Sequence, residues 1–278
     1  MTCRSNRYKI AFVAVFSALT MPLSAAPPTA SPAAIAAVDA SNLSRGDLSA
    51  EAYAFKQEVY RRHVARGVDS GRTRIYDLPP DQLAPIPGTD IPMRRDAATH
   101  LGELLTAARA DLARDLAMQP ANAEEIKRQN RARRVQELAV GNAYRSVSRQ
   151  FGIWNRNFAG YYAETQAKRE GLPGGEHGAA AAEFLREYIG VRVAAPGFSN
   201  HQAGIAVDFA LRLLPEKTLP GEATKAPQQL SASMAQNDPW RDSWFWNWLK
   251  FRAGEFGFVE YEAEAWHWEY KPEQVVKK

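Results

Sequence analysis

The 278-residue chain contains a single cysteine, Cys3. A disulfide within the chain and a metal site built from several thiolates are therefore both excluded. Cys3 also precedes the first apolar stretch, whereas a cysteine that carries a lipid anchor would follow such a stretch directly. If the leader described next is removed, no thiol nucleophile remains. Any catalysis then depends on nitrogen and oxygen groups.

Long apolar runs are also missing, because none reaches the roughly 20 residues that a membrane-spanning helix needs. The longest run, residues 10–23, follows three basic residues and precedes the small residues of positions 24–26. This pattern is typical of a secretory signal peptide over residues 1–26. We expect an exported protein, periplasmic or associated with the cell wall, with no transmembrane segment after leader removal.

Neither sign of charge is in large excess. The chain has 35 Lys and Arg against 31 Asp and Glu, a formal net charge of +4. Removal of the leader would take away three basic residues and no acidic one, which leaves a net charge of about +1. A nucleic-acid-binding domain carries a clear basic excess, so we expect no nucleic-acid partner.

Composition divides the chain into four parts. After the leader, residues 27–50 are rich in Ala, Pro and Ser, as flexible linkers are. We expect an N-terminal extension over residues 51–94, helical near 51–66, and one main domain over residues 95–278. The segment 212–237 is rich in Pro, Gly, Ala and Gln and indicates a surface insertion.

Apolar spacing predicts the elements of the main domain. Helices are expected at 97–118, 122–136, 179–188 and 238–253. Strands are expected at 138–140, 205–211 and 264–270. The predicted fold class is α+β, with helices packed on a small antiparallel sheet.

Two short segments near the C-terminus hold the residue types of a metal site. Residues 199–208 read Ser-Asn-His-Gln-Ala-Gly-Ile-Ala-Val-Asp, and residues 264–267 read Glu-Ala-Trp-His. A catalytic zinc takes three protein ligands and leaves a fourth position for water or substrate. The first segment is not the helical His-Glu-x-x-His motif, because Gly204 interrupts it and the residues that follow alternate like a strand. His201 is therefore expected in a loop and Asp208 on the next strand.

The two segments resemble the motifs of the D-alanyl-D-alanine carboxypeptidase (VanY-like) family of zinc metallopeptidases, S-x-H-x-x-G-x-A-x-D and E-x-W-H. A third family element, an aromatic followed by Arg-Ser and a later glutamine, matches Tyr144-Arg145-Ser146 and Gln150. The resemblance covers roughly residues 97–270. It implies a zinc D,D-peptidase (Hedgehog/DD-peptidase-like) fold with residues 95–278 as the catalytic domain. It also implies Zn²⁺ as cofactor and peptidoglycan stem peptides as partners.

The resemblance also implies the roles of single residues. Three zinc ligands are expected, namely His201, Asp208 and His267. Glu264 corresponds to the base that takes a proton from the attacking water and passes it to the leaving amine. Arg145 corresponds to the group that stabilises the anion developing on the attacked carbonyl. Ser199 and Gln150 are candidate hydrogen-bond donors to the substrate backbone, although Ser199 could equally orient the loop around His201.

Other carboxylates compete with Glu264 for the role of base. They are Glu260, Glu262 and Glu269. Positions three apart face opposite sides of a regular strand. Glu264 and His267 can therefore converge only if Glu264 lies at the bend before the strand.

The expected function is an exported zinc-dependent D-alanyl-D-alanine carboxypeptidase that removes the terminal D-Ala of peptidoglycan stem peptides. An L,D-carboxypeptidase or a murein endopeptidase on the same fold remains an alternative, because these enzymes use nearly the same ligands. A non-catalytic cell-wall-binding module is a further alternative, against which the presence of Glu264 and Arg145 argues. Trp240, Trp244 and Trp248, at helical spacing, are interpreted as a core face rather than a sugar-binding surface.

Overall fold

The computed structural model describes residues 39–215 and 227–274. The predicted leader, most of the predicted linker and part of the predicted 212–237 insertion lie outside these residues. Within the two ranges, none of the helices combines the length and the apolar character needed to cross a bilayer.

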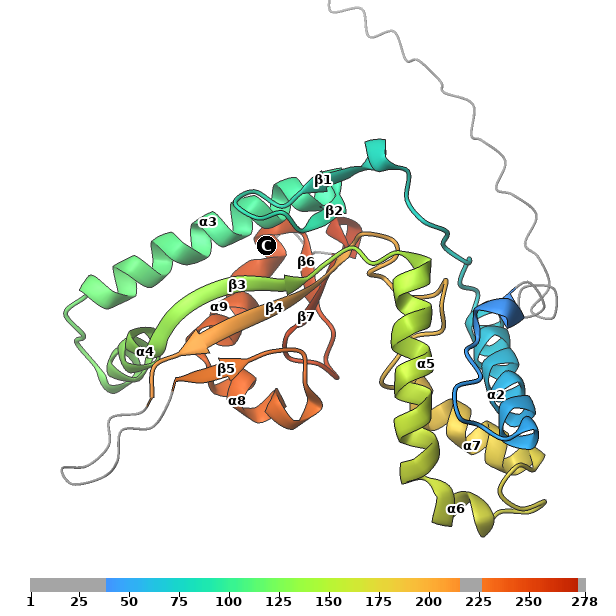
Figure 1. The fold of residues 1–278 in the computed structure, drawn as a ribbon. Helices are drawn as coiled ribbons and strands as arrows, with labels where there is room; N and C mark the ends of the chain where they lie inside the picture. The colour runs from blue at the N-terminus through green and yellow to red at the C-terminus, as the bar shows by residue number, and fades with distance from the viewer. Residues whose placement is uncertain (1–38, 216–226, 275–278) are drawn as a thin grey trace, which may run out of the picture.

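An antiparallel sheet is the centre of the larger lobe, and within the described residues it has five strands in the order β3-β4-β7-β6, with β5 beside β4 (Figure 1). Its strands are β3 (Val135–Asn142), β4 (Ala206–Leu213), β5 (Gln228–Leu230), β6 (Phe258–Glu260) and β7 (His267–Tyr270). A separate hairpin joins β1 (Leu83–Pro85) to β2 (Pro92–Arg94). The strands expected at 138–140 and 205–211 are confirmed. The one expected at 264–270 begins only at His267, after a turn.

Within the described ranges, four helices belong to this lobe, namely α3 (Arg95–Ala117), α4 (Ala123–Arg134), α8 (Asn237–Asp242) and α9 (Trp244–Arg252). They share one hydrophobic core with the sheet. In α3 the buried Leu101, Leu104, Leu105 and Ala108 recur at three and four residues, which puts them on one helix face. The helices expected at 97–118 and 122–136 are thus confirmed to within a few residues.

The helix expected at 238–253 is interrupted. Ser243 is extended, with ψ of 150°, and its side chain accepts a hydrogen bond from the Trp246 backbone N–H. Ser243 therefore ends α8 and caps the start of α9, as serine does at helix N-termini. Trp240, Trp244 and Trp248 are 0%, 3% and 8% exposed, which confirms the core face and leaves no sugar-stacking surface on them.

A second, helical lobe lies beside the sheet (Figure 1). It contains α2 (Ala50–Asp69), α5 (Val147–Glu164), α6 (Gln166–Glu170) and α7 (Ala179–Gly190). Its core joins α2 to α5 and α7 through Val59, Trp154 and Leu185, all of them fully buried. Helix α2, which lies in the predicted extension (residues 51–94), thus packs into the same core as helices of the predicted catalytic domain. The domain boundaries themselves stay a prediction.

Helix α5 was missed by the sequence analysis, which noted only the motif at its start. Short 3-10 turns complete the structure at Ala40–Asn42, Pro80–Gln82, Met234–Gln236, Ala253–Phe256 and Pro272–Gln274.

Candidate metal centre

Pairing of β4 with β7 brings together two residues that are 59 positions apart in the chain. Asp208 and His267 are direct partners in the antiparallel register, and such partners have closely spaced side chains. Asp208 Oδ1 lies 2.9 Å from His267 Nδ1. Both side chains are buried.

A tight turn delivers the third side chain, His201. Gly204 closes the turn, because its N–H donates to the His201 carbonyl at 3.1 Å and its φ is +64°. A side chain at position 204 would also meet the Arg94 backbone nitrogen at 2.8 Å. Glycine is thus needed here for both the left-handed conformation and the close approach. The turn places His201 Nε2 3.2 Å from Asp208 Oδ2.

The three side chains have the geometry of a metal site. One ligand atom from each of His201, Asp208 and His267 lies within 4.8 Å of the others. His201 Nδ1 lies 2.6 Å from the Ala143 carbonyl, so Nδ1 carries the proton and Nε2 presents a lone pair. That buried Nε2 has no hydrogen-bond partner among the described residues. Two imidazoles and one carboxylate fit a divalent transition metal such as zinc, with room for a fourth ligand.

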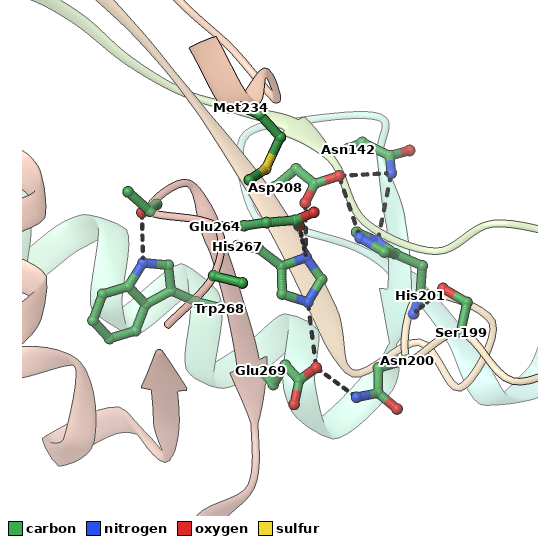
Figure 2. Close-up of polar contacts among 12 residues, drawn as sticks. Asn142, Ser199, Asn200, His201, Asp208, Met234, Glu264, His267, Trp268 and Glu269 are labelled. Carbon is green, nitrogen blue, oxygen red and sulfur yellow. Dashed lines mark hydrogen bonds and ion pairs between the residues drawn. The ribbon is translucent and has the colours of Figure 1, made fainter. Parts of the chain in front are cut away.

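On the other side of His267, Glu269 orients the ring. Glu269 Oε1 lies 3.3 Å from His267 Nε2 and accepts a hydrogen bond from Asn200 Nδ2 at 2.5 Å. Figure 2 shows Glu269 between these two side chains. The Nε2 proton is thus directed to Glu269, and Nδ1 faces Asp208 and Glu264. Lys271 forms an ion pair with the second oxygen of Glu269. From the sequence, Glu269 is predicted only as a competitor of Glu264 for the role of base. The signal that this prediction misses is the two-residue spacing along a strand, which puts both side chains on one face.

Charge and burial set the protonation of the cluster. Burial raises the pKa of Asp208, but the neighbouring His201 and His267 outweigh burial and hold this pKa well below its usual range. Burial lowers the pKa of His201, which favours the neutral, metal-binding imidazole. For His267 burial acts in the same direction, yet hydrogen bonds to Asp208 and Glu269 raise its pKa to about 9.

Glu264 lies in the turn before β7, which is the position required for it to converge with His267. Its N–H donates to the Tyr261 carbonyl and its carbonyl accepts from the His267 N–H. Glu264 Oε2 is 3.8 Å from His267 Nδ1, on the metal-facing side of the ring (Figure 2). Burial raises the pKa of Glu264, which brings a carboxylate closer to the range useful for a general base.

The competing carboxylates lie elsewhere. Glu260 accepts a hydrogen bond from Trp246 Nε1 at 3.0 Å and pairs with Lys250, while Glu262 is exposed to solvent. Glu269 contacts the opposite nitrogen of His267. Of the four carboxylates, Glu264 alone combines a position in the cluster with the metal-facing side of His267.

Arg145 reaches the cluster from the segment between β3 and α5. Its backbone N–H donates to the His201 carbonyl at 3.1 Å, and its Nη2 lies 3.5 Å from Asp208 Oδ2. Gln150 accepts from Arg145 Nη1 at 3.2 Å and donates to the Ala194 carbonyl at 2.9 Å. In this arrangement Gln150 positions the guanidinium. Contact of Gln150 with substrate stays a prediction.

Ser199 lies two residues before His201, at the start of the turn that Gly204 closes, and is buried. Its Oγ accepts from the His201 backbone N–H at 3.3 Å. This contact matches the loop-orienting alternative for Ser199, and its donation to a substrate backbone stays a prediction.

A family model described as VanY, D-alanyl-D-alanine carboxypeptidase, matches residues 116–273. The chain belongs to this family. The match contains every predicted site residue, and it confirms the predicted family, the metallopeptidase class and, with the observed sheet and helices, the α+β fold class. Helix α2 and most of α3 lie outside the match.

Among solved structures, the chain is similar to a vancomycin-resistance D,D-pentapeptidase VanY variant from a VanB-type resistance cassette, in complex with Zn(II). The identity is 21%, over 73% of this chain and 86% of that one, with a TM-score of 0.40. VanYB in complex with D-alanine-D-alanine gives 20% identity over 73% and 87%, with a TM-score of 0.40. The D,D-dipeptidase VanXYg with a phosphinate analogue gives 19% identity over 70% and 59%, with a TM-score of 0.31. A search of curated proteins gives no match.

The cluster of His201, Asp208 and His267 opens into a cavity of about 1490 Å³ between the two lobes. The lining includes Arg145, His201, Asp208, Glu264 and His267. The three candidate ligand side chains, Glu264 and Arg145 therefore face the same cavity.

Proposed function

We propose that this protein is an exported, zinc-dependent D-alanyl-D-alanine carboxypeptidase that releases the terminal D-Ala of peptidoglycan stem peptides. The observation that carries the proposal is the convergence of His201, Asp208 and His267 with Glu264 at one cavity, in a member of this peptidase family. A site that held zinc for stability alone would have no use for a carboxylate with a raised pKa beside the ligands.

His201 through Nε2, His267 through Nδ1 and Asp208 through its carboxylate would hold the zinc. Bound zinc would supply a Lewis acid that polarises the scissile carbonyl and lowers the pKa of water towards neutrality. Glu264 accepts the proton of the attacking water and delivers it to the departing amine of D-alanine. The Arg145 guanidinium, which Gln150 holds in place, donates hydrogen bonds to the oxyanion as the carbonyl is attacked.

The test is a digest of a peptidoglycan pentapeptide with the zinc-loaded protein, followed by mass spectrometry. We expect the loss of one D-alanine residue with the wild-type protein and no loss with the Glu264→Gln variant. Cleavage of a tetrapeptide instead would indicate an L,D-carboxypeptidase, and cleavage of cross-linked muropeptides would indicate an endopeptidase. Loss of the D-Ala-D-Ala dipeptide would also contradict the proposed specificity. Absence of any cleavage with one equivalent of zinc bound would contradict the enzymatic proposal.

Export rests on the leader-like residues 1–26. Fractionation of cells that express the full chain, beside a variant without residues 2–26, tests it. We expect the full chain outside the cytoplasm, shortened by about 26 residues, and the truncated variant inside.

A further inference from the structure

The cavity is larger than the proposed reaction needs. Sites for small molecules have volumes of about 300–1,000 Å³, whereas this cavity has about 1490 Å³. A terminal D-Ala-D-Ala unit at the metal ligands fills only a part of it. The rest is available to the chain on the N-terminal side of the cleaved bond.

Arginines are the most frequent charged residues on the lining of this cavity. Four of them, Arg66, Arg72, Arg149 and Arg192, line the cavity without a carboxylate partner among the described residues. We refer to these four as the basic wall. The other cations on the lining are engaged, because Arg186 pairs with Glu183 and Glu187, Lys271 pairs with Glu269, and Arg145 faces Asp208.

Little negative charge on the lining opposes the basic wall. Glu187 and Glu269 are paired as just described. Asp208 and Glu264 belong to the catalytic cluster, by which we mean His201, Asp208, His267, Glu264 and Arg145. Glu164 is the remaining carboxylate among the described lining residues, and it accepts a hydrogen bond from the Tyr188 hydroxyl at 2.6 Å. The wall beyond the cluster therefore has a net positive charge.

Members of the basic wall lie next to residues that adjoin or contact the catalytic cluster. Arg72 Nη2 donates to Asn200 Oδ1 at 3.2 Å, next to the ligand His201. Arg149 precedes Gln150, which holds Arg145. Arg192 lies over the Tyr188 ring at 3.8 Å and donates to the Tyr188 carbonyl at 2.7 Å, so its guanidinium is fixed at the cavity. Arg66 and Arg72 come from α2 and the residues after it, outside the family match.

We propose that the basic wall binds a carboxylate carried by the substrate on the N-terminal side of the cleaved bond. The proposal rests on the proposed carboxypeptidase function and adds that the preferred peptides are acidic. Guanidinium groups match carboxylates in bidentate geometry, and a cleft lined by one sign of charge concentrates ligands of the opposite sign. Substrate selection thus depends in part on residues outside the family region.

The test compares two acetylated pentapeptides that end in D-alanyl-D-alanine. One peptide carries a glutamate on the N-terminal side of the cleaved bond, and its twin carries glutamine at the same position. Their dissociation constants are measured by calorimetry with the zinc-loaded full-length Glu264→Gln variant, so that binding is observed without turnover. We expect the glutamate peptide to bind about threefold to tenfold more tightly, which corresponds to one or two exposed ion pairs. The difference should disappear at high salt.

Arg66→Ala with Arg149→Ala, in the same Glu264→Gln background, removes half of the basic wall and is expected to reduce the preference, and Arg66→Glu with Arg149→Glu to reduce it further. Arg109→Ala with Arg133→Ala is the matched control, because these exposed arginines lie on α3 and α4 and do not line the cavity. Equal affinities of the Glu264→Gln variant with an intact basic wall for the two peptides, or a preference of unchanged size in the Arg66/Arg149 variants, would overturn the proposal. Release of D-alanine by the wild-type protein is measured separately, so a failure of the proposed reaction is distinguishable from a failure of this inference.

Discussion

Replacement of Glu269 by alanine is expected to weaken zinc binding while the three ligands stay in place. In the structure His267 Nε2 lies 3.3 Å from Glu269 Oε1, which is the acceptor for the Nε2 proton. Asn200 Nδ2 donates a hydrogen bond to the same oxygen at 2.5 Å and holds it in place. Without it the ring is free to rotate or to place its proton on Nδ1, the nitrogen required by the metal. Loss of such a supporting partner lowers metal affinity by about 10- to 100-fold, which corresponds to about 1.4–2.7 kcal/mol.

Two further variants separate this effect from a loss of charge or of fold. Glu269→Gln keeps an oxygen towards His267 and should retain part of the affinity. Lys271→Met removes the ion pair with Glu269 but not the contact with His267, so it should change the affinity little.

The assay is competition for zinc against a chromogenic chelator, with thermal unfolding of the metal-free proteins as a check on folding. An affinity of Glu269→Ala within about twofold of the wild type, with folding intact, would refute the argument, because supporting partners are expected to contribute at least about tenfold.

Three other predictions follow from single residues. Arg145→Ala should lower kcat for D-alanine release by about 10²–10³-fold, measured with Arg109→Ala as control, and a loss below tenfold would remove Arg145 from the reaction. Burial lowers the pKa of His63 to about 4, and its Nδ1 accepts from Trp154 Nε1. Since the unfolded-state pKa is about 6.5, the stability contributed by neutral His63 is complete above pH 6.5 and is lost as pH falls towards 4, by up to about 3 kcal/mol. Urea unfolding at pH 7 and pH 5 checks this, and an equally steep loss in His63→Gln would contradict it. Gly204→Ala should lower the melting temperature and the zinc affinity together, whereas Gly46→Ala, also at positive φ but with open space around it, should lower the melting temperature alone.

Local patterns along the chain are enough for much of the fold. Leucines at three and four residues predict α3, because one helix face must be buried. Alternation after Gly204 predicts β4, and the three motifs predict the family. These features depend on residues close together in sequence, so no knowledge of distant contacts is needed.

Predictions failed where a boundary or an element depends on neighbours in space. The helix expected at 238–253 is split because Ser243 caps a new helix. Helix α5 was missed, although its buried Phe151, Trp154 and Phe158 pack against α2 and α7 across the helical lobe.

The sequence by itself determined which residues are the candidate ligands, base and guanidinium, because they stand in three short motifs that resemble those of the family. Tertiary structure decided which nitrogen of the His267 ring each carboxylate faces. Glu264 lies near Nδ1 and Glu269 near Nε2 only after β7 and the turn before it are formed. Tertiary structure also decided that α2 contributes arginines to the cavity. The physical reason is that burial, register and charge balance arise from contacts between distant segments, and these exist only in the folded chain.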